Sequence, residues 1–200
     1  MIPELRVIDP PAAIVTIADI RRHIVELPQE DESYVEMLAL AATSWIDGPT
    51  GWLGRALGIQ TLELTTDGFW SPCGDAIPLP FPPVLEVVSV VYADPSGQMV
   101  TLASGAYRAD VGGVRPTSGA WPDTADRSDA VRIRFKVGWA VFDKSDPPQL
   151  VSDVPAAIRV AILMLVGQWY RTREPVAIGA TVEKLPFAVD SLLQPYRVYR

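Results

Sequence analysis

The stretch from Val154 to Val176 contains an uncharged run, Val160 to Tyr170, that is apolar at almost every position. A helix that spans a membrane needs about 20 consecutive apolar residues. This run is only about half that length, so we expect it to form a helix within a folded protein. A helix that is apolar on nearly every side must be covered on more than one side.

Two apolar stripes follow this helix at helical spacing. The first contains Ile158, Ile162, Leu165 and Trp169, and the second, on roughly the opposite side, contains Val160, Leu163, Met164 and Gly167. One stripe can face the core of its own domain, whereas a second exposed row of large apolar side chains promotes association. We interpret the second stripe as a subunit contact. A central helix surrounded by its own domain would show the same periodicity.

The composition excludes several classes of protein. With 200 residues, of which 48% are hydrophobic, the chain can bury a core as one domain or as one domain with a large insertion. Its net charge of -7 disfavours generic binding to DNA or anionic lipid, since such binding needs a basic surface. The single Cys73 and the single His23 cannot form an internal disulfide or a zinc cluster, and we expect no cofactor. The use of a single cysteine predicts a cytoplasmic redox setting. No basic segment leads into an apolar run near the first residues, so we expect no export signal.

Two further helices are predicted in the first part of the chain. Thr16 and Asp19 have the spacing of a capping box, which predicts a short helix that ends before Pro28. A second helix is predicted from Asp31 to the breakers that begin at Gly48. Its buried stripe is expected to contain Tyr34, Leu38, Ala41 and Trp45, together with Val35 and Ala42.

The middle of the chain has the pattern of a sheet. Four runs rich in β-branched residues are separated by turn residues: IQTLELTT, VLEVVSVVYA, VTLASGAYRA and AVRIRFKVGW. The tetrapeptide Asp94-Pro95-Ser96-Gly97 predicts a hairpin turn between the second and third runs. In the last run Val131, Ile133, Phe135 and Val137 alternate with Arg132, Arg134 and Lys136, which predicts one packed face and one wet face.

Four segments carry a resemblance to a known family through their order along the chain. They are AATSWIDGPTGW after the second helix, IPLPFPPVLEVVSVVYADPSG at the start of the sheet, AVRIRFKVGW at its end and VPAAIRVAILMLVGQWYRTREPV in the last long helix. In this order they resemble the head-tail adaptor, or connector, proteins of long-tailed bacteriophages, including the adaptor of gene transfer agents. Relatives tend to have glutamate where Asp47 stands and a glycine-tyrosine pair where Gly138-Trp139 stands.

The resemblance implies an α+β fold in which a helical bundle from the N- and C-terminal parts of the chain carries an inserted antiparallel β-sheet subdomain. The implied division is an extended lead-in at 1–15, the first half of the helical part at 16–56, the β subdomain at 57–140, a connecting loop and the last long helix at 141–186, and a C-terminal arm at 187–200.

The resemblance also implies a function. Such proteins are structural virion proteins that are assembled in the bacterial cytoplasm. They form a ring beneath the portal, expected to be about twelvefold, and a closed ring needs a heterologous interface with two different patches on each subunit. The ring connects the portal to the stopper or tail, lets DNA pass nonspecifically through its channel and catalyses nothing.

Few residues offer catalytic or metal-binding chemistry. His23 lies four residues after Asp19, but no nucleophile motif accompanies this pair, so we interpret it as a surface pair on a helix. Asp123, Asp126 and Asp129 could supply oxygen ligands, yet their spacing is not that of a calcium loop. We therefore expect a solvated loop, no metal site and no enzymatic activity.

Two groups of residues are candidates for binding partners. Arg132, Arg134 and Lys136 could contact DNA in a channel, although pairing with acids of a neighbouring strand is the preferred interpretation. The C-terminal arm combines apolar residues with residue types common in binding hot spots: Leu192, Leu193, Pro195, Tyr196, Arg197 and Tyr199. We expect the arm to dock on the portal or on an adjacent subunit. A frayed terminus is the alternative.

Two other functions remain open. One is a small cytoplasmic enzyme with an active site in the loops of the sheet, which would require titratable groups that converge in a pocket. The other is a different virion part, such as a stopper or tail terminator.

Overall fold

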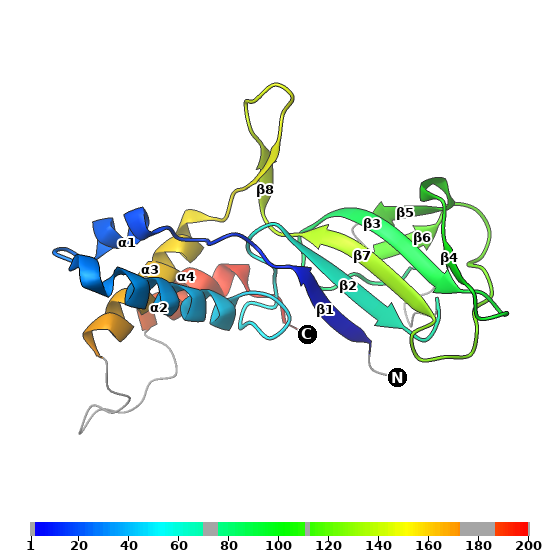
Figure 1. Ribbon diagram of the computed structural model, residues 1–200, viewed down its shortest axis with the longest axis horizontal. Coiled ribbons are helices and arrows are strands. Elements are labelled where there is room, and N and C mark those ends of the chain that lie inside the picture. The colour runs from blue at the N-terminus through cyan, green and yellow to red at the C-terminus, as the bar shows by residue number, and fades with distance from the viewer. Residues whose placement is uncertain (1–2, 70–75, 111–112, 173–186, 200) are drawn as a thin grey trace. The chain divides into compact units, whose positions relative to one another are not determined.

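The computed structural model of the protein describes residues 3–69, 76–110, 113–172 and 187–199. The chain divides into two compact units. The sheet unit contains Met1–Pro11 and Ile59–Ala140, and the helical unit contains Ala12–Gly58 and Val141–Arg200. Figure 1 shows the main sheet in the first unit and the four α-helices of the described residues in the second. The predicted α+β class is therefore confirmed.

The main sheet has five strands in the order β1-β2-β7-β3-β4, and every neighbouring pair is antiparallel. Its strands are β1 (Glu4–Asp9), β2 (Gln60–Thr66), β3 (Val84–Ala93), β4 (Met99–Thr101) and β7 (Val131–Val137). A separate two-stranded ribbon consists of β5 (Tyr107–Asp110) and β6 (Gly113–Pro116). The main sheet thus combines the first strand of the chain with strands that follow two helices.

Strand β7 lies at the centre of this sheet and has two different faces. Val131, Ile133, Phe135 and Val137 are all 0% exposed, while Arg132 and Arg134 are exposed and Lys136 is half-buried. Leu62 and Leu64 of β2 lie opposite Phe135 and Ile133 and are buried with them. The alternation predicted for this run is confirmed, because successive side chains of a strand point to opposite faces.

The predicted turn at Asp94-Pro95-Ser96-Gly97 joins β3 to β4 as a hairpin. The Oδ1 atom of Asp94 accepts hydrogen bonds from the backbone N–H groups of Ser96 at 2.9 Å and Gln98 at 3.0 Å. Gly97 has a φ of 85°, which favours glycine. Both features explain why this tetrapeptide was a reliable turn signal.

One prediction about the strands was wrong, and the structure adds a pairing to another. The run VTLASGAYRA is not one strand, because a 3-10 turn at Ser104–Ala106 ends β4 and places Tyr107–Asp110 in the separate ribbon. The extended segment at the start of the chain is strand β1, which pairs with β2 at the edge of the main sheet. Pairing with a strand so distant in sequence leaves little signal in the local pattern.

The helical unit contains α1 (Ile17–His23), α2 (Glu32–Ile46), α3 (Ala156–Arg171) and α4 (Phe187–Leu193). The capping box predicted for α1 is confirmed: Thr16 Oγ1 accepts from the Asp19 N–H at 3.2 Å, and Asp19 Oδ2 accepts from the Thr16 N–H at 3.0 Å. None of the helices in the described part of the chain is long and apolar enough to cross a membrane.

Helix α3 is the central helix of this unit. Helices α1, α2 and α4 all pack against it. Its most buried side chains include Ile158, Ile162 and Leu165, three members of the first predicted stripe. Trp169, the fourth member, is half-buried. Packing by three helices of the same chain accounts for most of the apolar character of α3.

The buried face of α2 is rotated from the predicted one. Val35 and Ala42 are buried as expected, but the other buried residues of α2 are Ala39 and Ile46. Tyr34, Leu38 and Trp45 are half-buried, and Ala41 is exposed. The prediction was wrong for Ala41 because α2 is apolar around most of its circumference, so that periodicity alone did not fix which stripe faces α3.

Candidate interaction surfaces

The loop that follows α2, residues 47–57, folds back on the end of the helix. The N–H groups of Trp52 and Leu53 donate to the carbonyl oxygens of Trp45 at 2.9 Å and Ile46 at 3.2 Å. The Oδ1 atom of Asp47 accepts a 2.7 Å hydrogen bond from the N–H of Leu57, a residue that is 0% exposed. Asp47 therefore closes the loop and satisfies a buried donor.

Replacing Asp47 with alanine is expected to lower the free energy of unfolding by about 1–3 kcal/mol, because the buried N–H of Leu57 would lose its acceptor. Urea denaturation followed by circular dichroism would measure the change. The control is Asp47→Asn, which keeps an acceptor oxygen and should lose less stability. Equal losses in both variants would contradict this role of Asp47.

The C-terminal segment 194–199 lies on this loop. The N–H of Val198 donates to the carbonyl oxygen of Leu53 at 2.9 Å, and Nε of Arg55 donates to the carbonyl oxygen of Tyr196 at 2.6 Å. Gly54 has a φ of 63°, and a Cβ added there would lie 2.7 Å from the carbonyl oxygen of Val198. The loop and the segment thus pack closely through backbone atoms.

Aromatic and basic side chains connect the same two segments. The guanidinium carbon of Arg197 lies 4.1 Å from the ring centroid of Trp52 and 4.9 Å from that of Tyr199, so the cation contacts two aromatic rings. Nε2 of Gln194 donates to the hydroxyl of Tyr199 at 2.6 Å. The segment is therefore ordered on its own chain rather than frayed.

The residues predicted for the portal-binding arm lie in different environments. Leu193 is 0% exposed and belongs to the core of the helical unit, and Leu192 is half-buried. Tyr196 and Arg197 are half-buried against the loop. Pro195 and Tyr199 are exposed, Tyr199 to 67%. Of the predicted arm residues, only Pro195 and Tyr199 are exposed while the segment stays docked. Arg200 lies outside the described residues.

The residues predicted for the subunit contact on α3 also separate. Val160 is 43% exposed, and Leu163 and Met164 are half-buried. Gly167 is buried against α1: a Cβ added to it would lie 3.3 Å from Nε2 of His23. Gly167 therefore contacts its own chain. Of the four predicted residues, Val160 is the one that is exposed.

Helix α2 exposes a row of apolar side chains that we call the α2 patch, consisting of Met37, Leu40 and Ala41. Met37 is 57% exposed and Leu40 is 64% exposed. Their spacing of three and four residues places them on one face of the helix. The sequence interpretation missed this patch because it assigned Ala41 to the buried side.

A second exposed apolar surface lies on the hairpin formed by β8 (Ala140–Phe142) and β9 (Leu150–Ser152). Figure 1 shows β8 rising in a narrow hairpin that extends away from the helices of the helical unit. We call its exposed apolar side chains the hairpin patch: Val141 at 45%, Phe142 at 72%, Leu150 at 37% and Val151 at 39% exposed. Adjacent residues of a strand point to opposite faces, so the patch covers both faces of the hairpin.

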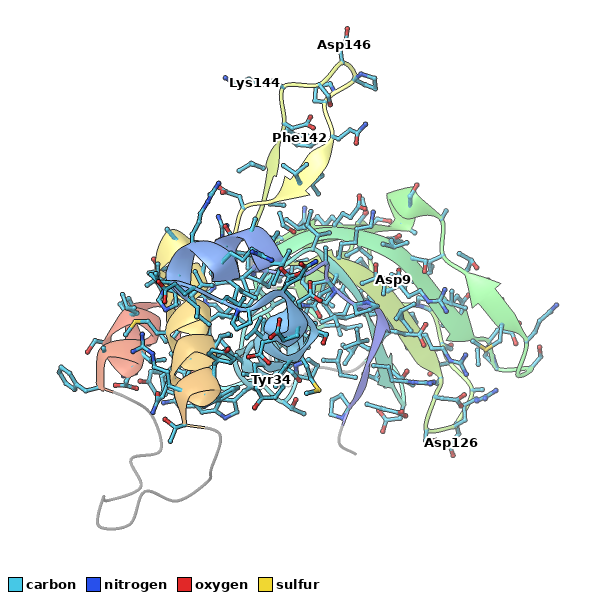
Figure 2. All side chains as sticks on the ribbon, turned by 60° about the vertical axis from the view of Figure 1, so that its left-hand side comes forward. Asp9, Tyr34, Asp126, Phe142, Lys144 and Asp146 are labelled. Carbon is cyan, nitrogen blue, oxygen red and sulfur yellow. The ribbon has the colours of Figure 1, made fainter. Side chains whose placement is uncertain are left out.

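The tip of the hairpin is ordered around Asp143. Its Oδ1 atom accepts hydrogen bonds from the N–H and the hydroxyl of Ser145 at 3.1 and 2.5 Å, and from the N–H of Gln149 at 2.8 Å. The hydrogen bond from the Ser145 side chain, followed by those from the two backbone N–H groups, holds the pKa of Asp143 below its usual value. Because the pKa is lowered, these hydrogen bonds stabilise the tip fully at pH values above the ordinary carboxyl pKa. This stabilisation is lost as the pH falls through the lowered pKa of Asp143. Figure 2 shows Phe142 on the hairpin and Lys144 and Asp146 at its tip.

The basic row of β7 is neutralised by carboxylates. Arg134 pairs with Glu63 at 2.6 Å, Lys136 with Glu86 at 2.7 Å and Arg132 with Asp129 at 2.8 Å. Glu63 belongs to β2 and Glu86 to β3, the two strands beside β7. The preferred interpretation, pairing with acids of a neighbouring strand, therefore agrees with the structure for Arg134 and Lys136.

The residues considered for catalysis or metal binding are not brought together. Asp19 accepts from Thr16 and from Nη2 of Arg159 at 3.2 Å, while His23 packs at Gly167. Asp129 is held by Arg127 and Arg132, and the hydrogen bond from Arg127 is the largest cause that lowers its pKa to about 2. Among the described residues no group of three His, Cys, Asp or Glu side chains could hold a metal ion. Cys73 lies outside the described residues.

Comparisons with known proteins identify the fold. A chain in a structure described as the neck of an empty gene transfer agent particle, computed with C6 symmetry, matches with a TM-score of 0.70 and 23% identity. A chain in the virion of a native particle matches with 0.68 and 24%, and one in the neck of a native particle, computed with C12 symmetry, with 0.62 and 23%. Each match covers 98% of this chain and 96% of the other. No protein-family model matches the chain, and no curated protein matches its sequence.

Proposed function

We propose that this protein is a structural component of the neck of a phage-like particle, either a bacteriophage or a gene transfer agent. The observation that carries the proposal is the likeness of nearly the whole chain, at 98% coverage, to chains from particle necks. The exposed apolar patches on α2 and on the hairpin add support, because exposed apolar surface of this kind marks contact sites.

Within the neck, the proposed role is that of an adaptor. Copies of the chain form a ring between the portal and the stopper or tail, DNA passes through the ring, and surfaces rather than catalytic residues carry the function. A twelvefold ring agrees with the C12 symmetry of one of the similar neck structures. The order of segments in the sequence, which resembles head-tail adaptors, favours this position over that of a stopper or tail terminator.

The experiment that tests the proposal is electron microscopy of the purified chain mixed with the portal of the same particle. We expect a ring of additional density on one face of the portal and a particle mass consistent with several copies of the chain. A chain that stays monomeric beside unchanged portal would contradict the adaptor role. A chain that binds only when the portal already carries a complete adaptor ring would instead be assigned to the stopper position.

The C-terminal segment is the proposed portal contact, with Tyr199 as its main accessible side chain. Tyr199→Ala is expected to weaken capture by the portal about 10- to 30-fold, the range for loss of an aromatic hot spot, without unfolding the chain. Surface plasmon resonance on immobilised portal would measure the effect. Deletion of the whole segment is a poorer test, because it also removes the partners of Leu53 and Arg55.

The matched control is Phe187→Ala, which removes an aromatic side chain that is 83% exposed in α4 and should leave capture unchanged. Equal capture by the Tyr199→Ala variant and the unaltered chain would refute the role of this segment.

A further inference from the structure

The hairpin of β8 and β9 carries large apolar side chains that its own chain leaves exposed. All three residues of β9 and two of the three in β8 are exposed, although four of these five side chains are large and apolar. A two-stranded hairpin with nothing packed on it is marginally stable in water. Such a hairpin is expected to be covered by another molecule.

The tip of the hairpin is held in one conformation by hydrogen bonds, which favours binding. Asp143 ties together Ser145 and Gln149 through three hydrogen bonds, and its own N–H donates to the carbonyl oxygen of Gln149 at 2.8 Å. A segment that is ordered before it binds loses less conformational entropy when it docks. The apolar residues at its base are therefore presented on a preformed support.

The α2 patch is a suitable acceptor on the same unit of the chain. Met37 and Leu40 are more than half exposed and lie on one helix face with Ala41. Glu36 is exposed beside them, one turn before Leu40, and Lys144 is exposed at the tip of the hairpin. The hairpin tip carries Lys144 together with the acids Asp143 and Asp146, so the match between the two surfaces is apolar rather than electrostatic.

We propose that the hairpin of one copy packs the face of its hairpin patch that carries Phe142 against the α2 patch of the neighbouring copy, and this rests on the ring proposed above. A closed ring needs one contact that joins two different surfaces of the same chain, so that each copy donates one surface and accepts the other. Copies with a net charge of -7 repel one another, which makes apolar patches the suitable surfaces for such a contact.

Cross-linking between two differently marked chains tests this contact. In a Cys73→Ser background, the Phe142→Cys and Leu40→Cys variants are prepared separately, one with a size tag, mixed with portal and treated with a short bismaleimide. We expect a cross-linked pair that contains one chain of each kind, and much less of any pair within either variant alone. The control mixes Phe142→Cys with Phe187→Cys, whose cysteine would replace another exposed aromatic residue, and should give severalfold less product.

The outcomes separate the contact from the proposed function. Rings on the portal together with the Phe142-Leu40 product support both. Rings without that product, or with only a product between two Phe142→Cys chains, overturn the hairpin contact and leave the adaptor role intact. The second of these results would indicate that hairpins pair with each other. The absence of rings with the unaltered chain overturns the adaptor role. A cross-linked pair of one Phe142→Cys chain and one Leu40→Cys chain, formed without rings, would still support the contact itself.

Discussion

Replacing Phe135 with alanine is expected to lower the free energy of unfolding of the sheet unit by about 3–5 kcal/mol. Phe135 is 0% exposed in the central strand β7, where it lies between Leu62 of β2 and Val87 of β3. Removal of the ring would leave a cavity at the middle of the sheet, and neighbours held in a sheet on both sides have little freedom to fill it. Urea denaturation followed by circular dichroism in the β-sheet region would measure the loss.

The matched control for Phe135→Ala is Arg132→Ala in the same strand. Arg132 lies on the opposite face, where its ion pair with Asp129 is exposed to solvent. Exposed ion pairs of this kind contribute little to stability. If both variants lost the same stability, the buried face of β7 would not be the core of the sheet unit.

The sequence predicted β7 well because its period of two is complete over seven residues. Apolar side chains at Val131, Ile133, Phe135 and Val137 alternate with charged ones, and only a strand places such residues on two faces. The capping box at Thr16 was equally readable, since both partners lie within one turn of each other. Local chemistry was sufficient in both places.

The buried face of α2 could not be predicted in the same way. Met37 and Leu40 are apolar but exposed, whereas the smaller Ala39 and Ala42 are buried. A helix that is apolar on more than one side offers several stripes of similar quality, and packing against α3 selects among them. In the adaptor proposed here, the remaining apolar side of α2 serves a neighbouring copy.

The surfaces proposed for binding were the least predictable part of the chain. The strands of the hairpin have three residues each, too few to show a period, and the order of its tip depends on the side chain of Asp143. The docking of Val198 on Leu53 joins positions far apart in sequence. The tyrosine and arginine residues of the C-terminal segment pointed to binding, but not to the contact of Arg197 with Trp52 on the same chain.

Helix α3 gives the second large effect. Ile162→Ala is expected to lower the free energy of unfolding of the helical unit by about 2–5 kcal/mol, because Ile162 is 0% exposed in the helix on which α1, α2 and α4 pack. Thermal denaturation followed by circular dichroism in the helical region would measure the change.

Val160→Ala in the same helix is the control that separates folding from assembly. Val160 is 43% exposed, and alanine has the higher helix propensity, so this variant should keep its full stability. If α3 also takes part in the ring, the Val160→Ala chain should fold normally and yet form fewer rings on the portal, since the contact loses two methyl groups without any change in the core. A large loss of stability from Val160→Ala would instead show that this side of α3 is covered by its own chain, and the subunit contact predicted there would be wrong.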